Sequence, residues 1–252
     1  MAPDILGAAT ATAPLDHELA QDLHQTVHDA CLWLTEAEEF VAHGARSAAL
    51  PLELCPGAFL LREFARPLER ALIAGIEEVL AAAPLRRMQT PGGKQMSVAM
   101  TNCGAAGWVA DRRGYRYQTS DPESGHAWPR MPCAFAELAH AAAGTVGFGG
   151  FNPDACLINY YVPGSRMSLH QDRDERDFRE PIVSVSLGLP AIFLLGGSTR
   201  SAKQQRVDLM HGDVLVWGGP ARLRFHGVLP IKEGRHETLG AMRINLTFRK
   251  AH

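Results

Sequence analysis

A His-x-Asp pair and a distant histidine are the residues of this 252-residue chain whose types and spacing point most directly to chemistry. His170 and Asp172 stand two residues apart, so their side chains project together if the backbone there is extended, and His226 follows later in the chain. Two imidazoles and one carboxylate can bind one face of an iron(II) ion and leave positions open for a co-substrate and oxygen. The pair alone is weak evidence, because the chain has 11 histidines and an exposed polar turn would show the same spacing.

Two arginines follow the distal histidine at close range. If residues 243–249 form a strand, Arg243 and Arg249 share one face with Asn245 and Thr247, while the alternate residues on the other face are apolar. The planar fork of arginine matches a carboxylate, and a dicarboxylate co-substrate chelated to a metal at one end needs such a partner at the other. The ligand set and the arginine pair together are therefore a stronger signal than either alone.

Two further segments, 155–162 and 222–228, offer polar faces if they are strands. Alternation places Asn159 and Tyr161 on one face of the first segment and groups His226 with the arginines of the second. Such faces often meet solvent, but a jelly roll can bring several of them into one pocket.

The elements that must position these residues are helical first and then stranded. Helical spacing of apolar residues extends over about 15–49, 67–83 and 133–143. From residue 153 onward short strands alternate with Gly- and Pro-containing turns, which predicts a mainly β protein with flanking helices (α+β) and a jelly-roll, or double-stranded β-helix, core. The expected strands are Ala155–Val162, Ile182–Leu189, Ala191–Leu195, Val214–Trp217, Arg222–Val228 and Met242–Arg249.

Composition limits the class of protein. Hydrophobic residues make up 46% and charged residues 21%, which allows a sizeable core, and the net charge of −2 disfavours a protein that coats nucleic acid. The five cysteines are scattered without a Cys-x-x-Cys pair, so we expect no disulfide framework and a cytoplasmic location. No apolar run approaches the length of a membrane span, and no secretory signal is evident. Residues 1–50 are expected to be an N-terminal extension, partly disordered and partly helical.

The segment 108–117 is the best candidate for contact with nucleic acid. It interleaves three arginines with Trp108, Tyr115 and Tyr117, which combines phosphate-binding charge with surfaces on which bases can stack. The alternatives are an ordinary solvated hairpin and a tryptophan buried in the core.

Over nearly all of the chain from about residue 55, the sequence resembles the AlkB family of dioxygenases. The order His-x-Asp, then His, then Arg-x5-Arg is specific to this branch. The matching stretches include Phe151–Gly164, His170–Leu195, His211–Gly219, Phe225–Pro230 and Arg243–Arg249.

The resemblance implies a site, residue by residue. The metal ligands and catalytic residues would be His170, Asp172 and His226. The residues that hold 2-oxoglutarate would be Asn159, Tyr161, Arg243, Asn245 and Arg249. The residues that contact the substrate would be Trp108, Tyr115, Tyr117, Asp174 and Arg200. A dioxygenase domain would extend over 51–252, with a substrate-recognition lid at about 85–130.

The resemblance also implies a reaction. Using iron(II), 2-oxoglutarate and O2, the enzyme would oxidatively dealkylate bases of the 1-methyladenine and 3-methylcytosine type and release formaldehyde, succinate and CO2. Its partner would be alkylated DNA, single-stranded in the first instance, with RNA as a second substrate, and it would be a monomer that binds no membrane. Two other readings are left open: an iron(II)/2-oxoglutarate hydroxylase that acts on tRNA, protein or a small molecule, and a non-catalytic jelly-roll binding module.

Overall fold

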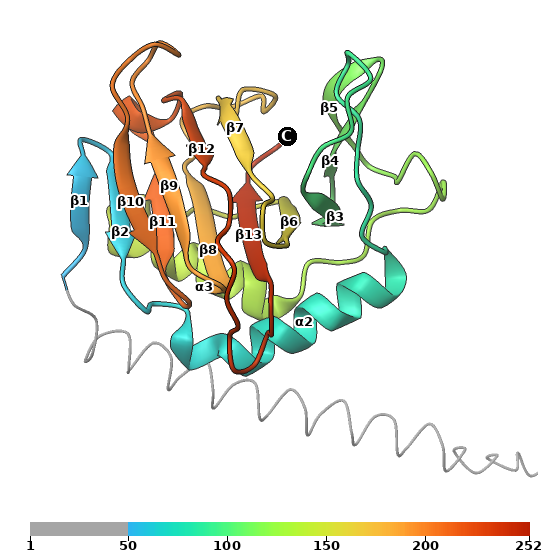
Figure 1. Cartoon of the computed structure of the whole chain (residues 1–252), viewed down its shortest axis with the longest axis horizontal. Coiled ribbons are helices and arrows are strands. Elements are labelled where there is room, and N and C mark those ends of the chain that lie inside the picture. The colour runs from blue at the N-terminus through green and yellow to red at the C-terminus, as the bar shows by residue number, and fades with distance from the viewer. Residues whose placement is uncertain (1–49) are drawn as a thin grey trace, which may run out of the picture. The chain divides into compact units, whose positions relative to one another are not determined.

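The computed structural model describes residues 50–252, so the expected extension and the helical segment at 15–49 lie almost entirely outside the described residues. In the described part, two antiparallel sheets face each other, and helices cover the outer face of the larger one (Figure 1). The small four-stranded sheet runs in the order β10 (Gln205–Leu209), β9 (Ala191–Leu195), β12 (His226–Val228) and β7 (Met167–His170). The large seven-stranded sheet runs in the order β1 (Leu52–Cys55), β2 (Ala58–Leu61), β11 (Val214–Trp217), β8 (Ile182–Gly188), β13 (Arg243–Arg249), β6 (Ala155–Tyr161) and β3 (Ala99–Gly104). The expected jelly-roll core is confirmed.

The strand β13 gives the large sheet one apolar face and one polar face. It lies between β8 and β6 and is buried along its whole length. Its apolar face packs toward the helices, where Phe248 meets Phe135 edge to face at 5.9 Å between ring centroids. Its polar face looks toward the small sheet. Cross-strand register then aligns Asn245 with Asn159 of β6 and with Ser186 of β8, which produces a continuous polar floor.

Two helices support this sheet from outside. A short 3-10 turn η1 (Arg66–Leu68) leads into α2 (Glu69–Ala82), and α3 (Cys133–Thr145) packs against α2, β8 and β11. A side chain at Gly75 would place its Cβ 2.9 Å from the Phe135 ring, so glycine allows the close approach of the two helices. The helices expected at 67–83 and 133–143 are confirmed. No helix among the described residues is both long and apolar enough to cross a membrane.

The strand expected over 222–228 is wrong in its first half. Gly219–Ala221 form the 3-10 turn η2, and the chain continues in a turn with Arg224 N–H donating to the Ala221 carbonyl, so pairing begins only at His226. The cause is the Gly218-Gly219-Pro220 sequence, in which Gly219 has a φ of 49° and proline lacks an amide hydrogen. The expected grouping of His226 with Arg222 and Arg224 on one strand face therefore does not hold.

A hairpin made of β4 (Gly107–Asp111) and β5 (Gly114–Gln118) stands beside the β3 edge of the large sheet (Figure 1). Two of its three arginines are engaged within the hairpin, because Arg113 and Arg116 both bind Asp111. The hairpin and β3 account for the ordered strands within residues 85–130, and β3 itself is an integral strand of the large sheet.

Candidate active site

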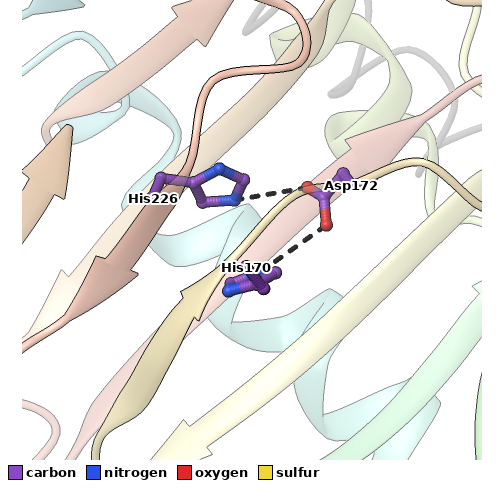
Figure 2. Close-up of side chains that lie close together, drawn as sticks. All are labelled: His170, Asp172 and His226. Carbon is purple, nitrogen blue, oxygen red and sulfur yellow. Dashed lines mark ion pairs between the residues drawn. The ribbon is translucent and has the colours of Figure 1, made fainter. Parts of the chain in front are cut away.

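The three residues expected to bind a metal converge at the end of the small sheet (Figure 2). β7 and β12 are antiparallel neighbours with His170 directly opposite His226, and the two ring centroids lie 4.4 Å apart. Asp172 follows β7 and places its oxygens 3.7 Å from Nε2 of His170 and 3.6 Å from Nε2 of His226. One ligand atom from each residue lies within 4.8 Å of the others, and no other such group occurs in the described part of the chain. The arrangement suits a two-histidine, one-carboxylate metal site.

The backbone sets the orientation of both imidazoles. Nδ1 of His170 lies 2.8 Å from the Ser168 carbonyl, and Nδ1 of His226 lies 3.0 Å from the Arg224 carbonyl. Because a carbonyl only accepts, each Nδ1 carries a hydrogen, and each Nε2 faces Asp172. Burial and the neighbouring His226 ring lower the pKa of His170 to about 4, so this ring is neutral at pH 7.

Asp172 is held by an arginine from the floor of the large sheet. Arg249 donates to Oδ2 of Asp172 through NH2 at 2.9 Å and Nε at 3.3 Å. Burial alone would raise the pKa of Asp172, but the Arg249 guanidinium outweighs that effect and holds the pKa well below its usual value. The carboxylate is therefore ionised and ready to bind a cation. Two nitrogens of Arg249 serve this carboxylate, so Arg249 does not present a free fork to a co-substrate.

A cavity of about 730 Å³ opens between the sheets beside the three ligand residues, a volume within the range of small-molecule sites. The residues expected to hold a dicarboxylate all line it, and they are Asn159, Tyr161, Arg243, Asn245 and Arg249. Asn245 has its hydrogen bonds within the protein, because its amide nitrogen donates to Ser184 and Val185 and its oxygen accepts from Asn159 and Thr247. It organises the floor of the cavity.

Arg243 is a buried residue with unpartnered hydrogen-bond donors that an anionic ligand could satisfy. Its side chain is 1% exposed and donates through NH2 to Ser186 at 3.0 Å, while its Nε and NH1 have no hydrogen-bond partner among the described residues. Its guanidinium carbon lies 4.9 Å from the centre of the Tyr161 ring, and burial lowers its pKa. Buried donors without partners are costly, and a carboxylate that enters the cavity would offer this guanidinium the acceptor oxygens that it lacks.

Four of the five residues expected on the substrate side gather at the mouth of the same cavity, and they are Trp108, Tyr115, Asp174 and Arg200. Trp108 of β4 stacks on Tyr115 of β5 with 5.5 Å between ring centroids, and its indole N–H donates to Asp174 at 2.8 Å. Arg200 lies with its guanidinium carbon 5.4 Å from the Phe225 ring. All four line the cavity. The structure thus joins the hairpin to the ligand cluster, which the sequence places far apart.

Tyr117 lies elsewhere. In the described structure it is absent from the cavity lining, and its hydroxyl donates to Glu175 at 2.7 Å, behind Arg249. Its position does not match direct contact with a substrate in the cavity.

Comparison with known proteins identifies the chain. A family model described as the 2OG-Fe(II) oxygenase superfamily matches residues 57–249. The alpha-ketoglutarate-dependent dioxygenase AlkB of Salmonella typhimurium is 54% identical over 198 residues, which cover 79% of this chain and 92% of the relative. This chain belongs to the AlkB dioxygenases. The Escherichia coli AlkB dioxygenase is 53% identical over the same share of each chain, and mouse "Nucleic acid dioxygenase ALKBH1" is 35% identical over 50% of this chain and 33% of its own. A solved structure titled "The structure of OsALKBH1" superimposes with a TM-score of 0.69 at 28% identity, covering 79% of this chain and 99% of that one.

Membership of this family makes the chain a dioxygenase that uses iron(II), 2-oxoglutarate and O2. The residues present fit these groups: the histidines and Asp172 offer nitrogen and oxygen ligands, and Arg243 offers unpartnered donors inside the cavity. The reading as a non-catalytic binding module is therefore wrong.

Two further residues at the site were not predicted in their observed roles: Glu175 gave no signal in the sequence, and Arg222 was expected on a strand face with His226. Glu175 and Arg222 are both buried and form an ion pair of 3.0 Å behind Asp172. Both occupy loops, where alternation and helical spacing carry no information about burial. Trp217, the last residue of the expected strand Val214–Trp217, is buried, and its ring lies 5.1 Å from that of His226 at the cavity wall.

Proposed function

We propose that this AlkB dioxygenase removes alkyl groups from ring nitrogens of damaged bases in DNA, of the 1-methyladenine and 3-methylcytosine type. The observation that carries the proposal is that one cavity contains both the ligand cluster of His170, Asp172 and His226 and the stacked pair of Trp108 and Tyr115. An aromatic platform beside an oxidising centre suits a planar base. The name of the mouse relative, a nucleic acid dioxygenase, agrees with this substrate class.

In the proposed reaction, the bound iron and 2-oxoglutarate supply the oxidation of a carbon–hydrogen bond of the N-alkyl group by O2, with succinate and CO2 as products. For an N-methyl base, hydroxylation gives a hemiaminal that breaks down to formaldehyde and the restored base. His170, Asp172 and His226 would hold the metal on one side, and Arg243 would bind the far carboxylate of 2-oxoglutarate. Arg249 keeps Asp172 ionised and oriented.

The base must leave its stack to enter the cavity, as enzymes that modify bases generally require. We propose that Trp108 and Tyr115 provide its stacking surface, that Asp174 fixes the indole and reaches the edge of the base, and that Arg200 contacts the substrate strand. The hairpin β4–β5 and the preceding segment from about residue 85 would form the lid of a domain over 51–252. Single-stranded DNA needs no unpairing, which favours it over duplex, and RNA would enter the same cavity.

The direct test incubates the purified protein with iron(II), ascorbate, 2-oxoglutarate and a single-stranded oligonucleotide that carries 3-methylcytosine. Formaldehyde and succinate are measured together. We expect both, in about equal amounts, because each dealkylation consumes one co-substrate. Succinate without formaldehyde would point instead to a hydroxylase of tRNA, protein or a small molecule. If neither succinate nor formaldehyde is formed, the assignment of the site is contradicted.

Truncating the stacking platform is expected to weaken substrate binding selectively. Base–aromatic stacking contributes roughly 1–3 kcal/mol per base, so Trp108→Ala should raise the KM for the oligonucleotide by about 5- to 150-fold. Trp108→Phe keeps a ring and should recover part of that loss. The affinity for 2-oxoglutarate, measured by titration, serves as the control and should not change. Equal loss of both affinities would contradict a role confined to the base.

We further propose a monomer in the cytoplasm. The four cysteines between residues 50 and 252 are free, as expected for a reducing compartment.

A further inference from the structure

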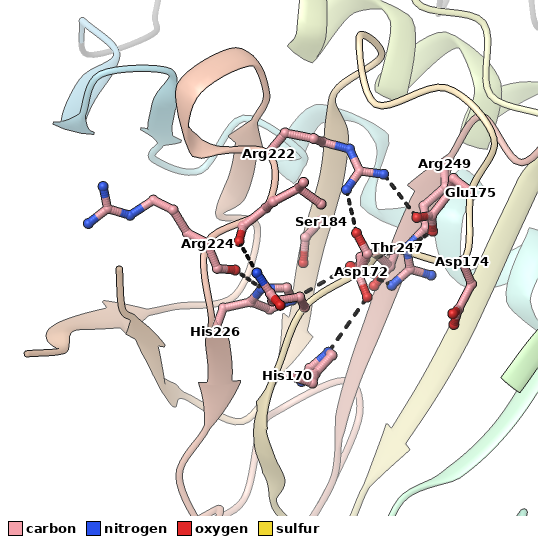
Figure 3. A network of polar contacts seen from close by, with 12 residues as sticks. His170, Asp172, Asp174, Glu175, Ser184, Arg222, Arg224, His226, Thr247 and Arg249 are labelled. Carbon is pink, nitrogen blue, oxygen red and sulfur yellow. Dashed lines mark hydrogen bonds and ion pairs between the residues drawn. The ribbon is translucent and has the colours of Figure 1, made fainter. Parts of the chain in front are cut away.

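A buried network of charged side chains lies behind Asp172, on the side away from the histidines (Figure 3). Its centre is Glu175, which is 6% exposed and has a partner on each oxygen. Oε2 accepts from Arg222 at 3.0 Å, and Oε1 lies 3.4 Å from Nε of Arg249. Both arginines also hold Asp172: Arg249 binds its carboxylate, and NH1 of Arg222 donates to its backbone carbonyl at 2.7 Å. Glu175 therefore fixes the two groups that fix Asp172.

The carboxylate of Glu175 also receives a hydrogen bond from the hairpin β4–β5, which we call the base-recognition hairpin. Tyr117 of β5 donates its hydroxyl to Oε1 of Glu175 at 2.7 Å. Burial raises the pKa of Tyr117 well above its usual value, so the hydroxyl stays protonated and acts as the donor. Tyr115, two residues earlier on β5, belongs to the stacking pair at the cavity mouth. A single short strand thus carries one tyrosine for the cavity and one for the network.

Charge balance explains why the network is stable where it lies. Two carboxylates, Asp172 and Glu175, face two guanidiniums, Arg222 and Arg249, and all four are buried. Removing one member of such a set leaves an uncompensated charge in a low dielectric, which is strongly unfavourable. The arrangement therefore permits little movement of Asp172 relative to β5.

We propose that Glu175 and Tyr117 are positioning residues that set the distance between the base-recognition hairpin and the metal ligand Asp172, so that oxidation is directed to a base held by the hairpin. The inference rests on the proposed function, because it takes Asp172 as a metal ligand and the hairpin as the site of the base. Neither residue touches the reacting atoms. Without the contacts of Glu175 and Tyr117, the enzyme would still consume 2-oxoglutarate, but it would oxidise the bound base in a smaller fraction of its turnovers.

Two variants test the hydrogen bond from the hairpin and the charge of Glu175 separately. Tyr117→Phe removes one hydroxyl and leaves the charges intact, whereas Glu175→Gln removes the charge at the centre. Each has a matched control with the same chemical change outside the cavity and the network: Tyr160→Phe on β6 and Glu137→Gln at an exposed position of α3. The measurements are the ratio of succinate to formaldehyde with the 3-methylcytosine oligonucleotide, the affinity for manganese(II) as a redox-stable probe of the metal site, and the Tm.

For Tyr117→Phe we expect formaldehyde production to fall roughly 10-fold while succinate production continues, with manganese affinity unchanged. For Glu175→Gln we expect the same loss of coupling together with a roughly 10-fold weaker affinity for manganese, because Arg249 and Arg222 lose their shared partner. The two controls should match the wild type in all three measurements.

A wild-type ratio of succinate to formaldehyde in Tyr117→Phe would overturn the link to the hairpin, and wild-type manganese affinity in Glu175→Gln would overturn the link to Asp172. If Glu175→Gln does not fold, Tyr117→Phe still decides the question, since it alters no charge. Failure of the proposed function is distinguishable, because the wild-type protein itself would then release no formaldehyde, while the manganese titration would still report on Glu175.

Discussion

Replacing Asp172 with alanine is expected to abolish turnover while the protein remains folded. The carboxylate supplies one of three ligand groups, and two imidazoles alone leave the ion weakly held and incorrectly oriented. Because loss of a group that merely supports a ligand typically costs 10- to 100-fold in affinity or activity, loss of the ligand itself should lower formaldehyde production by more than about 100-fold. Manganese binding should fall in parallel. The Tm should also fall, because Arg249 loses one of its two carboxylates, but Glu175 still accompanies it, so circular dichroism below the Tm should report a native fold.

Asp177→Ala is the matched control. Asp177 lies five positions along the same loop and pairs with Arg179, which is exposed at the surface, so its removal should leave activity and metal affinity at the wild-type level. Full activity of Asp172→Ala would contradict the assignment of the metal site, even if Asp177→Ala behaves as expected.

The sequence predicted the central strands and the ligand types because these depend on local pattern. In β13, apolar and polar residues alternate without interruption, so the alternation identified both the strand and the row of Arg243, Asn245, Thr247 and Arg249 that lines the cavity. The strands β9 and β11 were predicted with the observed bounds because each is a short apolar run between turn residues. Helical spacing likewise located α2 and α3.

The sequence could not predict contacts that depend on distant pairing. The two histidines approach because β7 pairs with β12, yet β7 has only four residues and no clear alternation, so its register could not be read in advance. Arg249 was expected to bind the co-substrate, and only the fold shows that Asp172 and Glu175 occupy two of its nitrogens. Tyr115 and Tyr117 share a face of β5, and what separates their roles is the neighbour that each one meets.

Arg243→Met is expected to produce a protein that is more stable without 2-oxoglutarate and nearly unable to bind it. The guanidinium is buried with two unpartnered donors. Replacing buried ion pairs with apolar side chains of similar volume is often neutral or raises stability by about 1–4 kcal/mol, and we expect a gain of that order for this unpaired charge. Losing one partner of a buried charge pair costs roughly 2–5 kcal/mol, so the Kd for 2-oxoglutarate should rise by about 30-fold or more.

Thermal unfolding with and without 2-oxoglutarate measures both effects in one experiment. The wild-type Tm should rise with co-substrate, since a ligand that binds only the native state stabilises it, whereas the Tm of Arg243→Met should start higher and stay constant. Arg179→Met, at an exposed surface pair, should behave as the wild type. Arg243→Lys keeps the charge but loses the fork, so its affinity should fall between the two. A co-substrate-dependent rise in Tm that survives in Arg243→Met would contradict this assignment, because it would show that a group other than Arg243 holds the far carboxylate.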